Sequence, residues 1–155
     1  MADLRGGQVT ISTKLGPTGL TFSSRGITGV TFCRPAPTPQ KIPAFVRTAT
    51  RQFQQFAAGK PVRFTTRLDL STGTTFQQAV WRTLRKIPHG ETRTYAWVAK
   101  QIGKPNAARA VGGACSANPV PVFVPCHRVV ASGGGLGGFS LGLPLKRRLL
   151  ALESQ

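Results

Sequence analysis

The sequence predicts an α+β fold in two parts, a small N-terminal α/β domain over residues 1–70 and a mainly helical C-terminal domain over residues 71–155. In residues 8–33, β-branched and apolar residues recur between glycines, which is typical of short strands joined by turns. From residue 76 onward, apolar residues recur instead at helical spacing. A chain of 155 residues is long enough for two compact halves, each with a modest core.

The N-terminal domain is expected to contain an antiparallel sheet and one helix. Turn-forming residues at Gly16-Pro17 and Arg25-Gly26 separate the predicted strands, so a β-meander is the simplest arrangement. A helix should follow the proline-rich stretch, with Pro43 in its first turn and Gly59 at its end. The apolar residues at helical spacing along it are Phe45, Val46, Ala49, Phe53 and Phe56.

The C-terminal domain is expected to begin around residues 67–75, which have little helical period. An apolar stripe of about three turns then predicts its first helix. Pro144 opens a terminal helix that can pack back on the domain. The residues of the first stripe are Phe76, Ala79, Val80, Leu84 and Ile87, and those of the terminal helix are Leu145, Leu149 and Leu152.

Between these helices, two short helices around a glycine-containing turn predict a helix-turn-helix. Thr94 is the expected N-cap of the first, Gly103 its left-handed stop, and Asn106 the cap of the second. A purely structural helical hairpin would give the same pattern. The expected inward positions are Trp97, Val98 and Ile102 in the first helix and Ala107, Ala110, Val111 and Ala114 in the second.

The charge of the chain indicates a polyanionic partner. There are 21 Lys and Arg residues against 4 Asp and Glu, a net charge of +17, which is far more than solubility requires. Nucleic acid is the leading candidate. The alternative is a general basic bias of the proteome, in which the charge is only a solvated surface.

The three cysteines, Cys33, Cys115 and Cys126, form neither a disulfide framework nor a metal-binding pair, because their number is odd and none are closely spaced. Reduced cytoplasm is therefore the expected location. No stretch approaches the roughly 18 to 20 apolar residues that cross a membrane, so no membrane association is expected. For Cys33 and Cys115 we favour simple packing.

The pair Cys126-His127 is the strongest candidate for chemistry. Val122, Phe123 and Val124 read as a buried strand that Pro125 ends, which favours an inert buried thiol. Against that, a thiolate needs a base, and the base needs an acceptor that orients it, so His127 and Glu153 make Cys126 a candidate nucleophile. Neighbouring side chains in an extended segment point apart, so a water molecule should bridge the two. The glycine-rich loop 131–138 is either a wall for a flat ligand or an ordinary flexible turn.

The segment Pro125-Cys126-His127-Arg128-Val129-Val130 resembles the active-site signature of the O6-alkylguanine-DNA alkyltransferases, which repair DNA by direct reversal. The resemblance continues through residues 76–121 and "KRRLLALE", and more weakly through "LGPTGLTF", "FAAG" and "LDL". It implies transfer of the alkyl group from O6-alkylguanine, chiefly O6-methylguanine, to the protein's own cysteine in a single irreversible turnover. O4-methylthymine is a second candidate substrate.

Carried over residue by residue, the resemblance makes Cys126 the nucleophile, His127 its base through a water, and Glu153 the residue that orients His127. Tyr95 would hydrogen-bond the guanine and help to protonate it as it leaves, and Lys146 would lie near the same network. The base pocket implied by the resemblance consists of Tyr95, Cys115, Val129, Phe139 and Ser140.

The resemblance also implies binding of double-stranded DNA by a monomer, with cooperativity on DNA left open. Arg109 would enter the duplex in place of an extruded base, because an enzyme that acts on a stacked base must first flip it out. Asn118 would be a hinge after the recognition helix, and Ala107, Gly112 and Gly113 would keep that helix slim for minor-groove docking. Arg128 is also assigned to DNA binding.

The sequence departs from the family pattern at three positions: Phe139 stands where many members have tyrosine, His89 replaces a common tyrosine, and Cys115 replaces a bulkier apolar residue. Some members hold zinc in the N-terminal domain, but only Cys33 is available there, so no metal or other cofactor is expected. The main alternative function is a non-catalytic alkyltransferase-like protein that binds damaged DNA. A Cys-His hydrolase and a plain transcriptional regulator explain fewer of these features.

Overall fold

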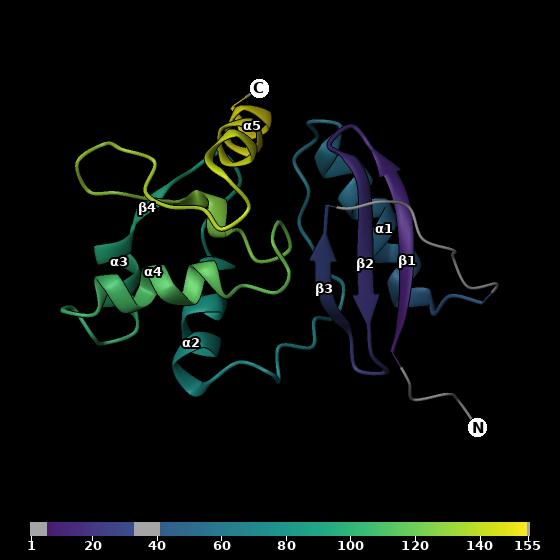
Figure 1. The fold of residues 1–155 in the computed structure, drawn as a ribbon, viewed down its shortest axis with the longest axis horizontal. Coiled ribbons are helices and arrows are strands. Elements are labelled where there is room, and N and C mark those ends of the chain that lie inside the picture. The colour runs from purple at the N-terminus through teal and green to yellow at the C-terminus, as the bar shows by residue number, and fades with distance from the viewer. Residues whose placement is uncertain (1–5, 33–40, 155) are drawn as a thin grey trace. The chain divides into compact units, whose positions relative to one another are not determined.

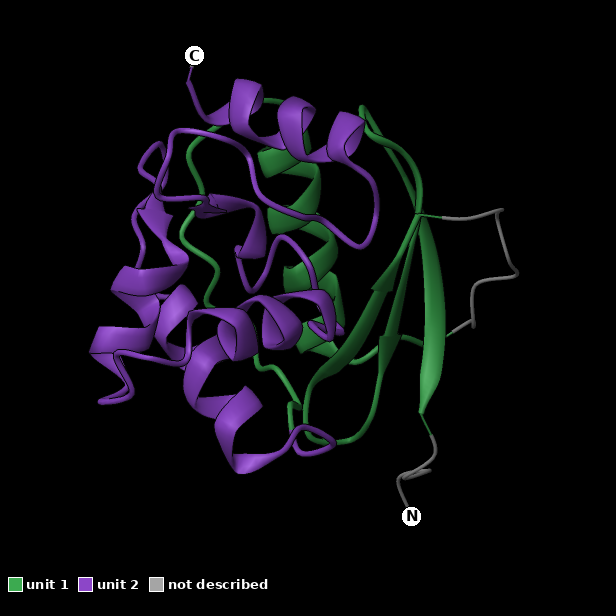
Figure 2. Cartoon of the chain, turned by 60° about the vertical axis from the view of Figure 1, so that its left-hand side comes forward, with its two compact units in different colours: residues 1–70 green, residues 71–155 purple. Residues whose placement is uncertain are grey.

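The computed structural model describes residues 6–32 and 41–154, so Cys33 and the proline-rich residues 34–40 lie outside the described part. The chain divides into two compact units, Met1–Leu70 and Ser71–Gln155 (Figure 2). One contains an antiparallel sheet with a helix and the other is mainly helical, which confirms the predicted α+β class. No helix in the described ranges is long and apolar enough to cross a membrane.

Unit 1 contains the predicted meander. Strands β1 (Gly7–Thr13), β2 (Gly16–Phe22) and β3 (Ile27–Thr31) form an antiparallel sheet in the order β1-β2-β3 (Figure 1). The first turn was predicted two residues too late. Thr13 pairs with Gly16, so the loop is Lys14-Leu15, and Gly16 opens β2 with a φ of 102° that favours glycine.

Helix α1 (Ala44–Ala57) covers the sheet with the predicted apolar face. Pro43 is its N-cap and Gly59 follows its end with a φ of 88°, as their positions in the sequence suggested. The chain then returns to the sheet, because Ile27 exchanges backbone hydrogen bonds with Arg67 and Asp69. The residues that are fully buried in this unit include Val9, Leu20, Ile27, Val46, Ala49 and Phe53.

Unit 2 begins with α2 (Thr75–Leu84). Its N-terminus has a capping box. The hydroxyl of Thr74 accepts a hydrogen bond from the backbone N–H of Gln77, and the side-chain oxygen of Gln77 accepts one from the backbone N–H of Thr74. The predicted stripe faces the core, and the indole of Trp81 is buried with it and donates to the Ala114 carbonyl at 2.9 Å. The other elements are β4 (Arg93–Thr94), α3 (Tyr95–Gln101), α4 (Ala108–Ser116), the 3-10 helix η1 (Cys126–Arg128), β5 (Val129–Val130) and α5 (Leu143–Glu153).

Helices α3 and α4 form the predicted helix-turn-helix, with two corrections. Thr94 caps α3 and Gly103 has the left-handed φ of 75° that ends it. Asn106 does not cap α4, because the helix begins later, with Ala107 at the N-cap position and no side-chain hydrogen bond. Ala110 is exposed rather than inward, and Cys115 is buried on the inner face with Val111 and Ala114.

The strand predicted for residues 122–124 is wrong, although these residues are buried. Val124 donates to the Val120 carbonyl across a tight turn, and Val122 has a φ of 78°. A β-branched residue in the left-handed region is strained, so surrounding contacts must hold the turn. The turn leads directly into η1 and therefore sets the position of Cys126.

Candidate active site

A cavity of about 470 Å³ in unit 2 contains the strongest candidate site. It lies between helices α3 and α4, the start of η1 and the loop after β5. Cys126 forms part of its wall although only 6% of that residue is exposed. The lining residues are Tyr95, Ala96, Ala108, Arg109, Gly112, Cys115, Ser116, Cys126, Ala131, Ser132, Gly138, Phe139 and Ser140.

Lys146 holds the loop side of this cavity in place. Its side chain is fully buried, and its ammonium donates to the carbonyls of Val129 at 2.7 Å, Gly138 at 3.1 Å and Leu136. Burial lowers the pKa of Lys146. Because one ammonium bonds β5 and two points of the loop, it fixes the loop against the core, a role that the sequence did not indicate.

Tyr95 stands at the first position of α3 and faces the same loop. Its hydroxyl donates to the Gly138 carbonyl at 3.4 Å, and burial raises its pKa. Gly137 has a φ of 72°, and a Cβ there would lie 2.7 Å from the tyrosine ring. The glycine-rich loop thus has a specific function, because a residue with a side chain could not approach Tyr95 this closely.

Asn118 fastens the strained turn that precedes Cys126. Its Nδ2 donates to the Val124 carbonyl at 2.8 Å, and its Oδ1 accepts from the Val120 amide at 2.9 Å. Burial raises the pKa of the Cys126 thiol, while a hydrogen bond from Asn118 and the charge of Lys146 act in the opposite direction. The resting cysteine is therefore a protonated thiol surrounded by groups that favour the thiolate.

His127 lies fully buried behind the cysteine and contacts the carboxylate of α5. Its Nε2 is 2.8 Å from Oε1 of Glu153. Burial lowers the pKa of His127, so the imidazole is neutral at pH 7 and able to accept a proton. Burial alone would raise the pKa of Glu153, but the hydrogen bonds and charges of His127 and Arg128 outweigh it and lower that pKa to about 2.

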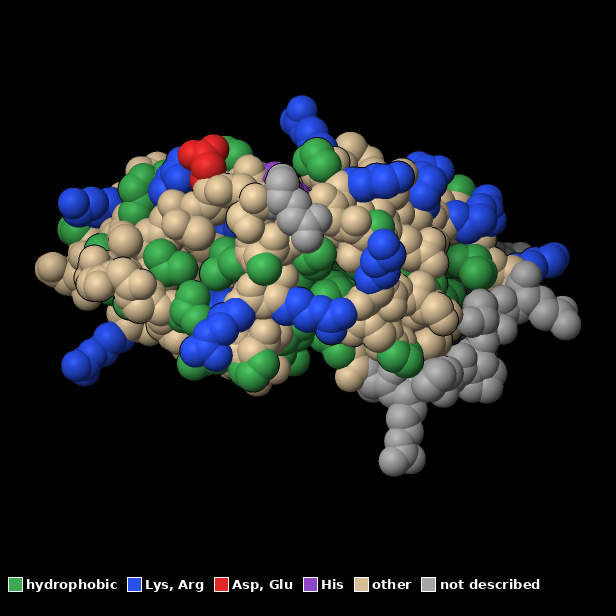
Figure 3. Space-filling model, turned by 90° about the horizontal axis from the view of Figure 1, so that it is seen from above, with side chains coloured by type: hydrophobic (Ala, Val, Ile, Leu, Met, Phe, Trp, Pro, Cys, Tyr) green, Lys and Arg blue, Asp and Glu red, His purple; other side chains and the backbone are tan. Residues whose placement is uncertain are grey.

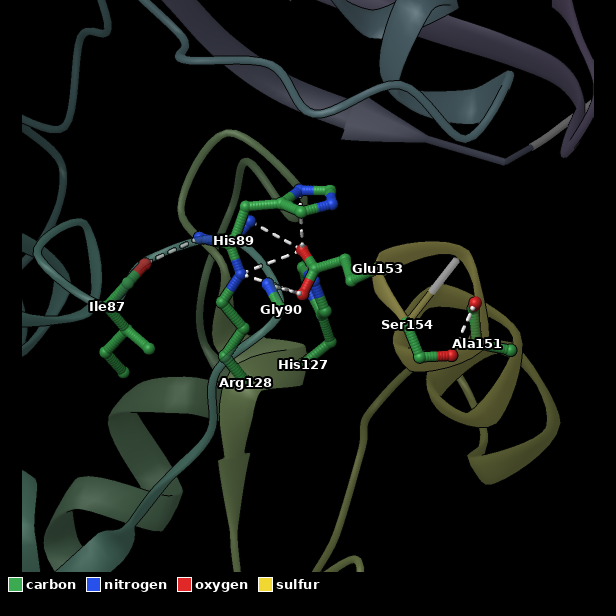
Figure 4. Close-up of polar contacts among 8 residues, drawn as sticks. All are labelled: Ile87, His89, Gly90, His127, Arg128, Ala151, Glu153 and Ser154. Atoms are coloured by element: carbon green, nitrogen blue, oxygen red, sulfur yellow. Dashed lines mark hydrogen bonds and ion pairs between the residues drawn. The ribbon is translucent and has the colours of Figure 1, made fainter.

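Arg128 is a correction to the sequence analysis, which assigned it to DNA binding. Only 6% of the residue is exposed, and its guanidinium donates to both carboxylate oxygens of Glu153, with Nη2 2.5 Å from Oε1. Its Nη1 donates to the Ile87 carbonyl at 2.7 Å (Figure 4). Since these donors point inward, Arg128 supports the buried carboxylate and does not face a ligand.

The predicted pocket residues mostly converge. Tyr95, Cys115, Phe139 and Ser140 line the cavity with Cys126, and the exposed Arg109 lies at its edge on α4 beside Gly112. Val129 is an exception, because it is buried in β5 outside the lining. Ala107 and Gly113 belong to the same helical region but do not line the cavity.

Sequence reasoning missed several residues of the site. Ala96, Ala108, Ser116, Ala131 and Ser132 complete the lining, yet small residues carry no chemical signal of their own. The composition gave one signal for the Arg128 ion pair. The chain has only four Asp and Glu residues, so a carboxylate near the active-site segment is a natural partner for a buried basic side chain. In the described ranges, no group of three or more His, Cys, Asp or Glu residues could hold a metal ion.

Similarity to known proteins identifies the family of this chain. Residues 75–155 match the family model described as "6-O-methylguanine DNA methyltransferase, DNA binding domain". The chain belongs to the 6-O-methylguanine DNA methyltransferase family. A family relative from Methanosarcina barkeri, named methylated-DNA--protein-cysteine methyltransferase, is 41% identical over 92% of this chain and 94% of its own length. One of the same name from Mycobacterium tuberculosis is 41% identical over 93% of this chain and 90% of its own length.

Solved structures of the methyltransferase family share the fold over both units. The crystal structure of Mycobacterium tuberculosis O6-methylguanine methyltransferase is similar with a TM-score of 0.83 and 39% identity, over 97% of this chain and 93% of that one. A crystal structure of Mycobacterium tuberculosis OGT in complex with DNA matches with a TM-score of 0.82 and 40% identity, over 94% and 92%. The family therefore accounts for almost the whole chain.

Proposed function

We propose that this chain repairs alkylated DNA by transferring the alkyl group from O6 of guanine, chiefly a methyl group, to the sulfur of its own Cys126. The single observation that carries the proposal is Cys126 in the wall of the cavity, with the His127–Glu153 pair directly behind it. Family relatives named for transfer from methylated DNA to a protein cysteine support the same reaction. O4-methylthymine remains a second candidate substrate.

His127 is the base of the reaction. The neutral imidazole takes the thiol proton of Cys126, through a bridging water, as the substrate enters the cavity. Glu153 stabilises the resulting imidazolium, because it is ionised and bonded to Nε2. Burial raises the pKa of Cys126, and Asn118 through its hydrogen bond and Lys146 through its charge oppose this rise and so favour the thiolate.

The transfer is a displacement at the alkyl carbon. A bond forms between the Cys126 sulfur and this carbon, the bond between carbon and O6 breaks, and its electron pair stays with the guanine. The hydroxyl of Tyr95 donates a proton to the departing guanine. The proton that left the thiol then returns the Tyr95 phenolate to its protonated form by way of His127 and solvent. No later step removes the alkyl group from the Cys126 thioether, so each protein molecule reacts once.

The substrate reaches the cavity as a nucleotide flipped out of double-stranded DNA, because O6 is stacked inside the duplex. Arg109 is exposed at the cavity edge and suited to fill the gap in the stack, while the small residues of α4, Gly112 and Gly113, suit close approach to a minor groove. The net charge of +17 supports phosphate contacts, and Figure 3 shows Lys and Arg side chains in blue, scattered among other side chains on the surface.

We further propose that the protein acts as a monomer in the cytoplasm, where a free thiol stays reduced. Residues 1–70 would be the N-terminal domain, and residues 71–155 the domain that binds DNA and accepts the alkyl group. A non-catalytic protein that only binds the lesion is the alternative, and the presence of Cys126 at the cavity favours transfer over it.

The decisive experiment is mass spectrometry after incubation with duplex DNA that contains one O6-methylguanine. The protein should become heavier by one methyl group, located on Cys126. Cys126→Ser should bind the same DNA without gaining mass. Cys115→Ser is the matched control, since burial raises the pKa of Cys115 to about 12, and this variant should still accept the methyl group. A wild-type protein that binds but never gains mass would be a damage-binding protein instead.

A further inference from the structure

Helix α1 presents exposed arginines that no carboxylate of the same helix balances. Arg47 and Arg51 stand four positions apart, so they share one side of the helix, and both are exposed. Helix α1 contains no Asp or Glu. In the described residues of unit 1, the single carboxylate side chain is that of Asp69, whose Oδ2 accepts a hydrogen bond from the Ser23 hydroxyl at 2.8 Å. The exposed side of α1 is therefore strongly positive.

The charges on α1 are not placed where they would stabilise a helix. Like charges at positions i and i+4 repel each other, and Arg47 and Arg51 have this spacing. The helix dipole favours acidic residues in the first turn and basic residues in the last, and α1 has neither. Arg47 instead lies near the N-terminus of the helix, where a cation is disfavoured. Because these charges weaken the helix, they indicate a negatively charged partner outside it.

A neighbouring segment, residues 63–67, brings two more arginines beside α1. The side chain of Gln52 on the helix donates through Nε2 to the Thr65 hydroxyl at 2.9 Å and accepts through Oε1 from the Thr65 amide at 3.2 Å. Exposure alternates along the segment, and Arg63 and Arg67 are exposed together with Thr65. The four exposed arginines of the helix and the segment are named the arginine strip, which consists of Arg47, Arg51, Arg63 and Arg67.

The fold holds two guanidinium groups of the arginine strip in place. Cζ of Arg67 lies 4.5 Å from the centre of the Phe45 ring, which is a cation–π contact. Nη1 of Arg47 donates to the Ile42 carbonyl at 2.7 Å. A guanidinium has more N–H donors than these contacts use, so both groups keep donors for a ligand. Side chains that are already held lose less entropy on binding, which suits a contact surface.

We propose that the arginine strip binds the phosphate backbone of double-stranded DNA, as a second contact surface that lies in unit 1 and requires no lesion. Guanidinium groups are suited to this partner, because their planar array of donors matches the oxygens of a phosphate. The inference takes from the proposed function only that DNA is the partner of the chain. Phosphate contacts carry no sequence information, so the strip holds the protein on undamaged DNA between lesions.

The salt dependence of binding to an undamaged duplex tests the arginine strip directly. Each phosphate contact contributes about −0.9 to the slope of log K against log[salt]. The double variant Arg47→Gln/Arg51→Gln should therefore have a slope shallower by about 1 to 2, and should bind about tenfold or more weakly at about 0.1 M salt. Arg63→Gln/Arg67→Gln should show an effect of the same size. A slope equal to that of the wild type in either folded double variant would overturn the proposal.

Lys14→Gln/Arg25→Gln is the matched control. It removes the same charge from two exposed positions of unit 1 that lie in the turns of the sheet, and it should change the slope by less than about 0.5. A change as large as that of the arginine variants would mean that net charge alone acts, and would also overturn the proposal. Binding to undamaged DNA needs no alkyl transfer, so a failure of the strip is distinguishable from a failure of the proposed function. If one double variant does not fold, the other still decides the question.

Discussion

Nε2 of His127 lies 2.8 Å from Oε1 of Glu153, although the two residues are 26 positions apart in the chain. The contact joins η1, which carries Cys126, to the last helical residue of α5. Through this contact, the C-terminal helix takes part in the chemistry. The buried Glu153 carboxylate stays ionised because His127 and Arg128, both in η1, bond to it.

The ion pair predicts an acid-sensitive stability. Glu153 has a folded-state pKa of about 2 against an ordinary value of 4.5, so its contribution is fully present above about pH 5 and is lost as the pH falls toward 2. The shift corresponds to roughly 3 kcal/mol. Glu153→Gln should therefore lower the free energy of unfolding at pH 7 by about that amount and flatten its decline between pH 5 and 2, as measured by urea denaturation.

Glu91→Gln is the matched control for this prediction. Glu91 forms an ion pair with Arg93 at 2.9 Å, but half of its side chain is exposed, and exposed pairs contribute only about 0–1 kcal/mol. Equal effects of Glu91→Gln and Glu153→Gln on the free energy of unfolding would show that the buried network does not stabilise the protein.

Asn118 links the turn to the thiol, so Asn118→Ala should affect both. The substitution removes the hydrogen bonds to Val124 and Val120 and the one that lowers the pKa of Cys126. We expect this pKa to rise further, because a hydrogen bond worth about 1 kcal/mol is lost, which reduces the thiolate fraction and slows alkylation of Cys126 by iodoacetamide about threefold or more at pH 8. Asn106→Ala, at an exposed asparagine before α4, should leave the rate unchanged. Identical iodoacetamide rates in the two variants would contradict this role of Asn118.

Lys146→Met should loosen the glycine-rich loop. Three carbonyls, those of Val129, Leu136 and Gly138, lose a charged donor in this variant, and each unsatisfied buried group costs about 1–3 kcal/mol. Amide hydrogen exchange over residues 131–140 should accelerate at least tenfold, and transfer should slow because the cavity wall moves. Lys100→Met, at an exposed position of α3, is the control. Unchanged exchange in the loop would mean that Lys146 does not hold it.

The elements that local periodicity determines were predicted correctly. Phe53 and Phe56 recur at helical spacing, and α1 buries both. Thr94 and Gly103 have the chemistry of helix ends, which acts within a few residues. These features are local, so the sequence displays them directly.

Features that depend on distant contacts were not predictable in the same way. The left-handed φ of Val122 is opposed by its β-branched side chain and is held by Asn118. Arginine is usually exposed, yet Arg128 is buried because it pairs with Glu153, 25 positions away. In both cases the tertiary contact outweighs the local preference of the residue.

Arg109→Ala should separate the chemistry of transfer from the opening of the duplex. Arg109 is exposed at the cavity edge, whereas Cys126 and His127 are buried, so the substitution leaves the nucleophile and its base in place. A residue that fills the gap in the base stack matters only when a base has been flipped out, and unstacking costs a few kcal/mol. Transfer from duplex DNA should therefore slow about tenfold or more, while transfer from free O6-methylguanine base should stay within about twofold. Arg82→Ala is the control, because Arg82 is exposed on α2 outside the cavity lining, and it should change neither rate. If Arg109→Ala slowed transfer equally on both substrates, this arginine would act in transfer itself and not in base flipping.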